Sequence, residues 1–399
     1  MNADVSQIPR LLQQQYEQRA ADTAPDVSDP KIRATVPLVW SLSDFVAVSC
    51  QRSPELLPEL DASGELLRCY DAGELQQKLE KAAQDCRSEE ELKRVLRQQR
   101  RREMVRIAWR DLAGWADLQE VVNTVSELAD ASIIIAQRFA NADLAEKHGQ
   151  PLDEQGQPMA LCVIGMGKLG AGELNFSSDI DLIFAYPEDG ETGGKRPLTH
   201  REYFIRLGKK LVQLLGETTA DGFVFRVDMR LRPNGNSGAL ALSFDAMDHY
   251  YLTHGREWER YALVKARAIT GGTSAADLMQ RLKPFVYRKY IDFTVVENLR
   301  ELKNRIEHEL KRKGVQHNIK LGPGGIREIE FVAQAWQLIR GGREPDLQDR
   351  RLLVILQRLA QKRLLPEAVA KQLRDAYVYL RRLEHRLQMI NDQQTQTLP

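Results

Sequence analysis

The sequence predicts an α+β fold, in which a small mixed β-sheet is flanked by a helical N-terminal region and a C-terminal helical bundle. Two short apolar runs enclose a glycine-rich turn in residues 160–186, and residues 223–231 alternate between apolar and polar side chains, as strands do. Helical spacing of apolar residues dominates the remainder. We therefore predict three parts, residues 1–117, 118–272 and 273–399. The last has no closing element, so we expect a truncated bundle and a chain that is a fragment.

Composition narrows the class of protein. The chain has 57 basic and 56 acidic residues, which gives a net charge of +1 and no general attraction to nucleic acid or to an anionic membrane. The four cysteines form no CxxC pair, which is typical of reduced thiols. No apolar run approaches the roughly 20 residues that span a bilayer. We predict a cytoplasmic protein that binds neither nucleic acid nor membrane.

The N-terminal region contains a strongly basic helix. Ser88 and Glu91 form a capping box, which predicts a helix start. The run from Lys93 to Arg106 contains seven lysines and arginines. Such a run is typical of a nucleic-acid-binding arm or of a solvated helix face, and the solvated face is the interpretation that we favour.

Further elements follow from periodicity and from turn residues. A long amphipathic helix is predicted from Leu118 toward Gly149, and a second capping box, Thr199 with Glu202, predicts a helix that stops at Gly216. The remaining expectations are strands at 160–164, 180–186, 223–231 and 239–244, and only helices from residue 245 onward, including 321–342 and two more between 347 and 390.

The glycines of the central turn admit several interpretations. Gly165, Gly167 and Gly170 satisfy the GxGxxG pattern of dinucleotide-binding proteins. That pattern requires a full helix and then an acidic residue about 20 positions on, at the far end of the second strand. Here Asp179 and Asp181 lie 14 and 16 residues past Gly165, at the start of the strand. The spacing argues against a dinucleotide site, and it does not match a phosphate P-loop either.

The two aspartates favour a nucleotidyltransferase site. Asp179 and Asp181 lie on one face of the predicted strand, with Cα atoms about 6.6 Å apart, so both carboxylates can reach a pair of divalent metal ions. Asp228, on the alternating strand, is the candidate for a third ligand. We therefore predict Asp179, Asp181 and Asp228 as catalytic and Mg²⁺-binding residues. For Asp228 alone, an ordinary ion-pair ladder with Arg226 and Arg230 is an equally good interpretation.

Phosphate binding is predicted around the same turn. Glycines let the backbone approach a phosphate closely, and lysines and arginines supply charge. Taken singly, each basic residue is more typical of a surface or ion-paired position. Ser178 is at least as typical of a residue that caps the turn before the strand. The candidate nucleotide-binding residues are Gly165, Gly167, Lys168, Gly170, Ser178, Arg230, Arg232 and Lys265.

Four longer motifs carry a resemblance to a known family. GMGKLGAGELNFSSDIDLIFAY, VDMRLRPNGNSG, REWERYALVKAR and KLGPGGIREIEFVAQ together resemble the bifunctional glutamine synthetase adenylyltransferase/adenylyl-removing enzymes. The resemblance covers residues 106–399 closely and the first hundred residues loosely. It implies a nucleotidyltransferase core of the DNA polymerase β superfamily. The NFSSDIDL sequence is similar to that of the family's N-terminal domain, which removes AMP.

The resemblance implies a reaction and partners. Inorganic phosphate attacks the adenylyl-tyrosine of glutamine synthetase and releases ADP, and Asp179, Asp181 and Asp228 match the family's metal-binding carboxylates. It also implies regulation by PII signal proteins, with the uridylylated form favouring removal. Two rival hypotheses stay open: ATP-dependent attachment of AMP to glutamine synthetase, and a regulatory binding module with an inert nucleotidyltransferase core.

Overall fold

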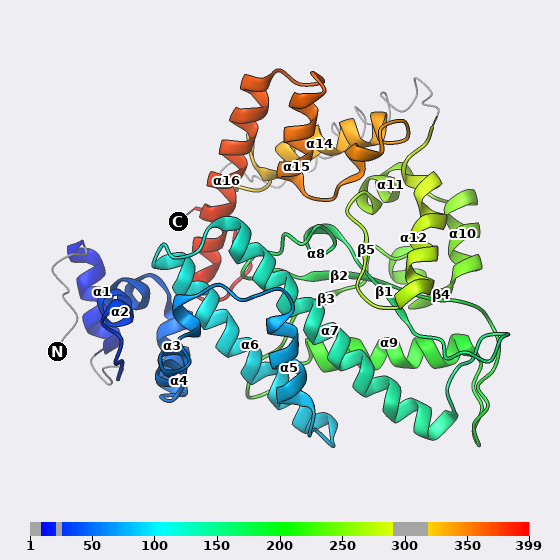
Figure 1. Cartoon of the computed structure of the whole chain (residues 1–399), viewed down its shortest axis with the longest axis horizontal. Helices are drawn as coiled ribbons and strands as arrows, with labels where there is room; N and C mark the ends of the chain where they lie inside the picture. The colour runs from blue at the N-terminus through cyan, green and yellow to red at the C-terminus, as the bar shows by residue number, and fades with distance from the viewer. Residues whose placement is uncertain (1–8, 21–25, 290–317, 399) are drawn as a thin grey trace. The chain divides into compact units, whose positions relative to one another are not determined.

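The computed structural model describes residues 9–20, 26–289 and 318–398 (Figure 1). Within these residues the chain is mostly helical and has one small mixed sheet, which confirms the α+β class. Its internal contacts define two compact units. Unit 1 comprises residues 1–131, 174–178 and 381–399, and unit 2 comprises residues 132–173 and 179–380. The predicted division at residues 117 and 272 remains a prediction.

Unit 1 is built from helices. Asp29 begins α2 by accepting hydrogen bonds from the amides of Lys31 and Ile32. The helices are α1 (Arg10–Ala20), α2 (Pro30–Leu42), α3 (Asp44–Arg52), α4 (Leu56–Ala62), α5 (Glu74–Ala83), α6 (Glu89–Leu112) and the first part of α7 (Leu118–His148).

No single helix in the described ranges is long and apolar enough to cross a membrane. Only the bent pair of α2 with α3 meets that test, on length and composition alone.

The basic helix α6 begins as predicted but does not present a solvated basic face. Ser88 and Glu91 form the expected capping box. Arg106 is 1% exposed; it donates to the carbonyl oxygens of Glu65 and Arg68, and its guanidinium carbon lies 3.6 Å from the centre of the Tyr70 ring. The solvated-face prediction is therefore wrong for most of this run, because the unit supplies carbonyls, carboxylates and a ring that pair with the cations internally. The buried basic residues of α6 are Lys93, Arg97, Arg100, Arg106 and Arg110.

The sheet of unit 2 has β2 at its centre. Strand β2 pairs antiparallel with β1 and parallel with both β3 and β4, and β1 pairs antiparallel with β5. Because β1 and β2 are antiparallel, the glycine turn between them does not belong to a dinucleotide-binding βαβ unit, in which the two strands are parallel. The strands are β1 (Cys162–Gly165), β2 (Ile180–Tyr186), β3 (Val227–Asp228), β4 (Ala241–Ser243) and β5 (Arg267–Ala268).

Helices cover both faces of this sheet. On one face, Ile164 and Ile183 pack in a core cluster with α10 (Phe244–Thr253) and α12 (Gly272–Val286), which lie beside the strands in Figure 1. On the other face, Phe184 lies against Gly208 of α9 (His200–Gly216), where an added Cβ would come within 2.7 Å of the ring. Strand β2 is consequently buried along its length except at Asp181.

One predicted strand is much shorter in the structure, and one strand was not predicted. Of residues 223–231 only β3, two residues long, joins the sheet, because the sheet ladder reaches this segment only beside Ile180 and Asp181. Strand β5 was not predicted, since only helices were expected after residue 245. Its two residues carry no periodic signal, and their pairing with β1 alone makes them a strand.

The C-terminal helices of unit 2 form a second apolar cluster. Helix α14 begins at Ile326 rather than at Leu321, because residues 318–325 form a turn in which the side chain of Asn318 accepts from the amides of Lys320 and Leu321. The two helices expected between residues 347 and 390 are present. The cluster joins α14 (Ile326–Arg340), α15 (Leu352–Gln361) and the first part of α16 (Glu367–Met389). Two further helices of unit 2 lie outside this cluster, α8 (Gly167–Ala171) and α11 (Glu257–Leu263).

Candidate functional site

The three predicted aspartates lie at the leading end of β2 and on β3. Asp181 pairs in register with Asp228 across parallel strands, so the two side chains lie side by side on one face, about 4.8 Å apart between strand axes. Asp179 precedes Asp181 by two residues and therefore points to the same face. The strand register thus brings Asp181 and Asp228 together, and the charge of Asp179 acts on Asp181 from just before the strand.

Two of the carboxylates face arginines. Arg226 donates to Asp179 at 2.7 Å, and Arg230 donates through Nε to Asp228 at 2.8 Å. The side chain of Arg230 is 73% exposed, so its hold on Asp228 is open to solvent and weak. Its hydrogen bonds lower the pKa of Asp228 from the ordinary value. Of the ion-pair ladder considered for Asp228, the pair with Arg230 is present, whereas Arg226 pairs with Asp179 instead.

The environment of Asp181 disfavours its negative charge. Partial burial, together with the nearby charges of Asp228 and Asp179, raises the pKa of Asp181 to about 6. Among the described residues it has no ion pair within salt-bridge distance, although the charges of Lys320 and Arg230 act on it. A carboxylate held beside two others favours a compensating cation.

The donor set suits Mg²⁺. In the described part of the chain no three His, Cys, Asp or Glu side chains already form a metal-binding cluster. All three aspartates are nevertheless hard oxygen donors of the kind that Mg²⁺ prefers. Gly167 lies against one of them: its φ is +54°, and a Cβ there would stand 3.0 Å from Oδ2 of Asp181. The glycine thus leaves the space beside this carboxylate open.

The other glycines of the turn serve packing. A Cβ at Gly165 would meet the side chains of Ile269 and Leu169, and one at Gly170 would come within 2.0 Å of the carbonyl oxygen of Lys265. Gly170 therefore lets helix α8 lie directly on the chain before β5. Of the three glycines in the pattern, Gly167 is the one next to the carboxylates.

The predicted phosphate-binding residues occupy different settings. Lys168 is half-buried in α8, and Ser178 is the half-buried residue directly before Asp179. Arg232 braces its own turn by donating to the carbonyl oxygens of Met229, Asn236 and Gly238. Arg230 is the exposed cation beside the aspartates. The structure therefore brings Arg230 to the carboxylates and gives Arg232 a local structural role.

Lys265 is buried. Its ammonium donates to Oε1 of Glu330 at 2.7 Å and lies 3.9 Å from Oε2 of Glu173, and its side chain is 8% exposed. Its positive charge is shared between two carboxylates of the protein. Lys265 is therefore a buried, ion-paired cation rather than an exposed one.

Lys320 is a residue near the site that the sequence had not singled out. Its positive charge acts to lower the pKa of Asp181, and it lies in the 318–325 turn that precedes α14. The motif KLGPGGIREIEF includes this lysine, but its placement opposite β2 depends on a tertiary contact between segments about 140 residues apart in the chain, which no local pattern encodes.

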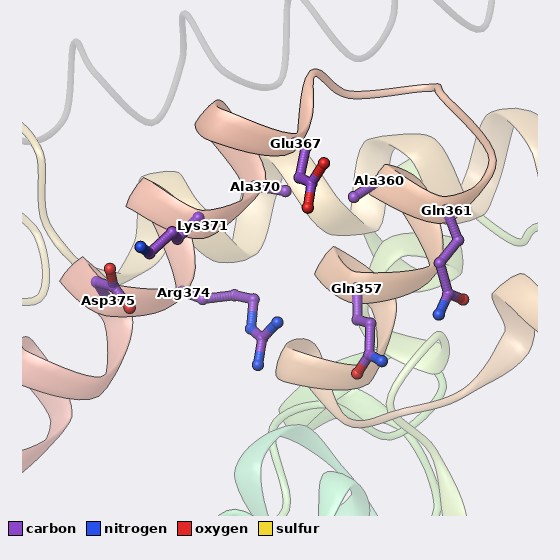
Figure 2. Close-up of a pocket in the computed structure, with 8 residues that line it drawn as sticks. All are labelled: Gln357, Ala360, Gln361, Glu367, Ala370, Lys371, Arg374 and Asp375. Carbon is purple, nitrogen blue, oxygen red and sulfur yellow. The ribbon is translucent and has the colours of Figure 1, made fainter.

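A separate groove of about 570 Å³ lies between α15 and α16. Figure 2 shows Arg374 reaching from α16 toward Gln357 of α15, with Glu367 near Ala360 at the other end. None of the sequence-predicted site residues lines it. The lining residues are Gln357, Ala360, Gln361, Glu367, Ala370, Lys371, Arg374 and Asp375.

Two family profiles match the chain. The profile described as glutamate-ammonia ligase adenylyltransferase matches residues 34–282, which hold the sheet and all three aspartates. The profile described as GlnD PII-uridylyltransferase matches residues 300–399.

Curated relatives agree with the first profile. A protein of Nitrosococcus oceani is 50% identical over the whole of this chain, one of Pseudomonas syringae pv. tomato is 52% identical over 90% of it, and one of Pseudomonas putida is 49% identical over 99%. All three are named bifunctional glutamine synthetase adenylyltransferase/adenylyl-removing enzyme. The chain spans about two fifths of their length: 42%, 37% and 42%. The chain therefore belongs to the glutamate-ammonia ligase adenylyltransferase family.

Proposed function

We propose that this chain is an adenylyl-removing nucleotidyltransferase that phosphorolyses the adenylyl-tyrosine of glutamine synthetase. The observation that carries the proposal is the register that sets Asp181 beside Asp228, with the charge of Asp179 acting on Asp181 as well. Three adjacent carboxylates on a small mixed sheet suit two-metal phosphoryl chemistry. Removal, rather than attachment, is supported by the NFSSDIDL sequence, which resembles that of the AMP-removing domain.

The proposed reaction balances without a further reactant. An oxygen of inorganic phosphate forms a bond to the α-phosphorus of the adenylyl group, and the bond between that phosphorus and the tyrosine oxygen breaks. ADP leaves, and the tyrosine oxygen takes up a proton. Bound Mg²⁺ supplies positive charge to the phosphoryl oxygens and to the departing oxygen.

The residues of the chain prepare this step. Asp179, Asp181 and Asp228 would hold the metal ions, and the missing side chain at Gly167 keeps the space beside the Asp181 carboxylate open. Arg230 is exposed and only weakly held, so it is able to leave Asp228 and pair with a phosphate oxygen when Asp228 binds metal.

The same proposal includes a regulatory partner. The match of residues 300–399 to the PII-uridylyltransferase profile supports a role for the C-terminal helices in regulation by PII signal proteins, with the uridylylated form favouring removal.

A single assay separates the proposal from its rivals. We expect the chain, incubated with adenylylated glutamine synthetase, Mg²⁺ and phosphate, to produce ADP. ATP-dependent labelling of unmodified synthetase without ADP release from the adenylylated form would support attachment instead. Binding to the synthetase without either reaction would support the inert regulatory module.

Matched variants test the carboxylates in that assay. Asp179→Asn and Asp181→Asn are expected to lower turnover by roughly three orders of magnitude or more, because each removes a metal ligand. Asp277→Asn is the control, since Asp277 is an exposed carboxylate of α12 that pairs with Arg281. Wild-type turnover in both site variants would refute the metal assignment.

A further inference from the structure

A buried ionic cluster joins the glycine turn to the C-terminal helices within unit 2. It consists of Glu173, Lys265 and Glu330, whose side chains are 7%, 8% and 13% exposed. Lys265 lies between the two carboxylates, 2.7 Å from Glu330 and 3.9 Å from Glu173. Burying three charges is costly, and a cluster of this kind is a weak source of stability. Its value therefore lies in what it positions.

Glu173 contacts two of the three C-terminal helices directly. Its Oε1 accepts from the amide of Leu352, the first residue of α15, at 3.0 Å. The local N-cap residue of α15, Arg351, makes no side-chain cap, so Glu173 satisfies this helix end from a distant segment, and its negative charge suits the helix dipole. Its Oε2 accepts from the hydroxyl of Tyr377 in α16 at 3.4 Å.

Glu173 is also anchored to the turn on its own side. Its amide donates to the carbonyl oxygen of Lys168 at 2.8 Å, which closes the end of α8. The main chain of Lys265 contacts the same helix so closely at Gly170 that an added Cβ would lie 2.0 Å from the Lys265 carbonyl oxygen. Arg267 of β5 adds a hydrogen bond to the carbonyl oxygen of Leu169 at 3.1 Å. Helix α8 is thereby held along its whole length.

The opposite end of α8 meets the aspartates. The amide of Met166 donates to the carbonyl oxygen of Asp181 at 2.9 Å, and Gly167 lies against the Asp181 carboxylate. The one short helix therefore contacts the candidate metal ligand at its start and the ionic cluster at its end. A displacement of α14 or α15 that moves Glu330 or Glu173 would therefore also move α8, which lies against Asp181.

We propose that Glu173 and Lys265 are positioning residues that hold α8 against Asp181 by tying it to α14, α15 and α16. They act through α8 and touch neither metal nor nucleotide. The proposal deepens the proposed function, on which its kinetic consequence rests, and it assigns to Lys265 a supporting role in place of a phosphate contact. It also gives the C-terminal helices a physical route to the site.

Hydrogen exchange on the full chain tests the positioning directly. Glu173→Gln keeps the shape and an oxygen acceptor for Leu352 but removes the charge. We expect the amides of Gly170, Gly172 and Glu173, which close α8, to exchange about tenfold faster in this variant. Glu344→Gln is the matched control, because Glu344 forms a surface pair with Lys362 in the same unit and is expected to leave these amides unchanged.

Two kinetic readouts distinguish positioning from general stability. Glu173→Gln is expected to lower kcat about tenfold and to raise the Mg²⁺ concentration needed for half-maximal turnover, with KM for adenylylated synthetase within about twofold of wild type. Lys265→Met is expected to lower kcat more than the double variant Lys265→Met/Glu173→Gln does, because the single change removes the positive charge between two buried carboxylates and leaves both negative charges in place. Additive effects in this cycle would contradict the proposal.

The outcomes remain separable from the proposed function. Unchanged exchange at α8 in Glu173→Gln overturns the positioning role, and so does faster exchange with wild-type kcat and Mg²⁺ dependence. If wild type lacks nucleotidyl transfer, the proposed function fails, yet the exchange comparison still decides whether the cluster holds α8. Should Glu173→Gln not fold, Glu330→Gln, which leaves Glu173 with Lys265, replaces it with the same expected direction.

Discussion

At the residue scale, the site is organised around the electrostatic cost of Asp181. The strand register puts its carboxylate next to Asp228, and burial keeps water from screening the repulsion, so the pKa of Asp181 rises to about 6. Gly167 provides the space beside it that a larger residue would fill. These features cost free energy in the metal-free chain, and a bound cation would recover it.

The pH dependence of stability follows from this shift. Asp181 has a pKa of about 6 in the folded chain against 3.8 ordinarily, so the folded form binds the proton more tightly. Without metal, the free energy of unfolding is therefore expected to fall as pH rises from about 4 to about 6, by roughly 1–3 kcal/mol. Asp181→Asn removes this loss and is expected to be more stable than metal-free wild type by that amount at neutral pH.

Thermal or urea unfolding measured with EDTA across this pH range checks the prediction. Mg²⁺ at a thousand times its Kd should reverse the order at neutral pH, because only wild type gains binding free energy, about 4.1 kcal/mol. Equal stability of the two proteins at neutral pH without metal would count against the raised pKa.

At the element scale, α6 shows that charge along a helix does not determine which face is exposed. Its basic residues repeat through the run, and several are buried because neighbouring segments of unit 1 offer partners. Glu65 is one of the residues that pair with α6, through Arg102. Burial acts to raise the pKa of Glu65, but hydrogen bonds from Lys78 and Arg102 outweigh burial and lower the pKa to about 2. The helix is therefore an internal scaffold of unit 1.

Replacing one buried arginine of α6 should destabilise the protein. Arg106→Met removes the guanidinium that satisfies the carbonyl oxygens of Glu65 and Arg68 and stacks on Tyr70, so we expect a loss of about 2–4 kcal/mol. Arg94→Met, at an exposed position of the same helix, is the control and should change stability by less than about 0.5 kcal/mol. Urea denaturation measures both variants. Equal unfolding midpoints for Arg106→Met and Arg94→Met would contradict the idea that the buried arginine contributes more to stability than the exposed one.

At the scale of the whole molecule, the chain passes between its two units several times. Unit 1 takes residues 174–178 and 381–399 in addition to its first 131 residues. The inserted segments are bonded to each other and to the helices: the Ser177 amide donates to Oε1 of Gln388 at 2.9 Å, and Arg100 pairs with Asp392 at 2.7 Å. A contiguous N-terminal piece would lack these contacts.

Gln388 is the residue that tests this arrangement. Its side chain is fully buried, and Gln388→Leu leaves the buried amide of Ser177 without its acceptor, so we expect a loss of about 1–3 kcal/mol in the free energy of unfolding. Gln394→Leu, at an exposed position of the same terminal segment, is the control. The idea that residues 174–178 and 381–399 are integral to unit 1 would be untenable if both variants matched wild type in calorimetry.

Local patterns predicted much of the secondary structure. The capping boxes at Ser88 and Thr199 mark the starts of α6 and α9, because a cap is a set of hydrogen bonds within four residues. Strand β2 has the predicted bounds, since its apolar run is bracketed by aspartates and a proline. The i, i+2 spacing of Asp179 and Asp181 predicts a common face by the same kind of local rule.

Contacts between distant segments decided the rest. The alternation in residues 223–231 predicted a long strand, but only the two residues that meet Ile180 and Asp181 pair. Lys265 looked like a cation for phosphate, and its burial between Glu173 and Glu330 comes from segments more than sixty residues away on either side. The sequence by itself determined the α+β class, the helix caps and the paired aspartates, because hydrogen bonds and side-chain alternation act over a few residues. Only the tertiary structure decided which charges are buried and which carboxylates meet, because burial and register depend on what the rest of the chain packs against them.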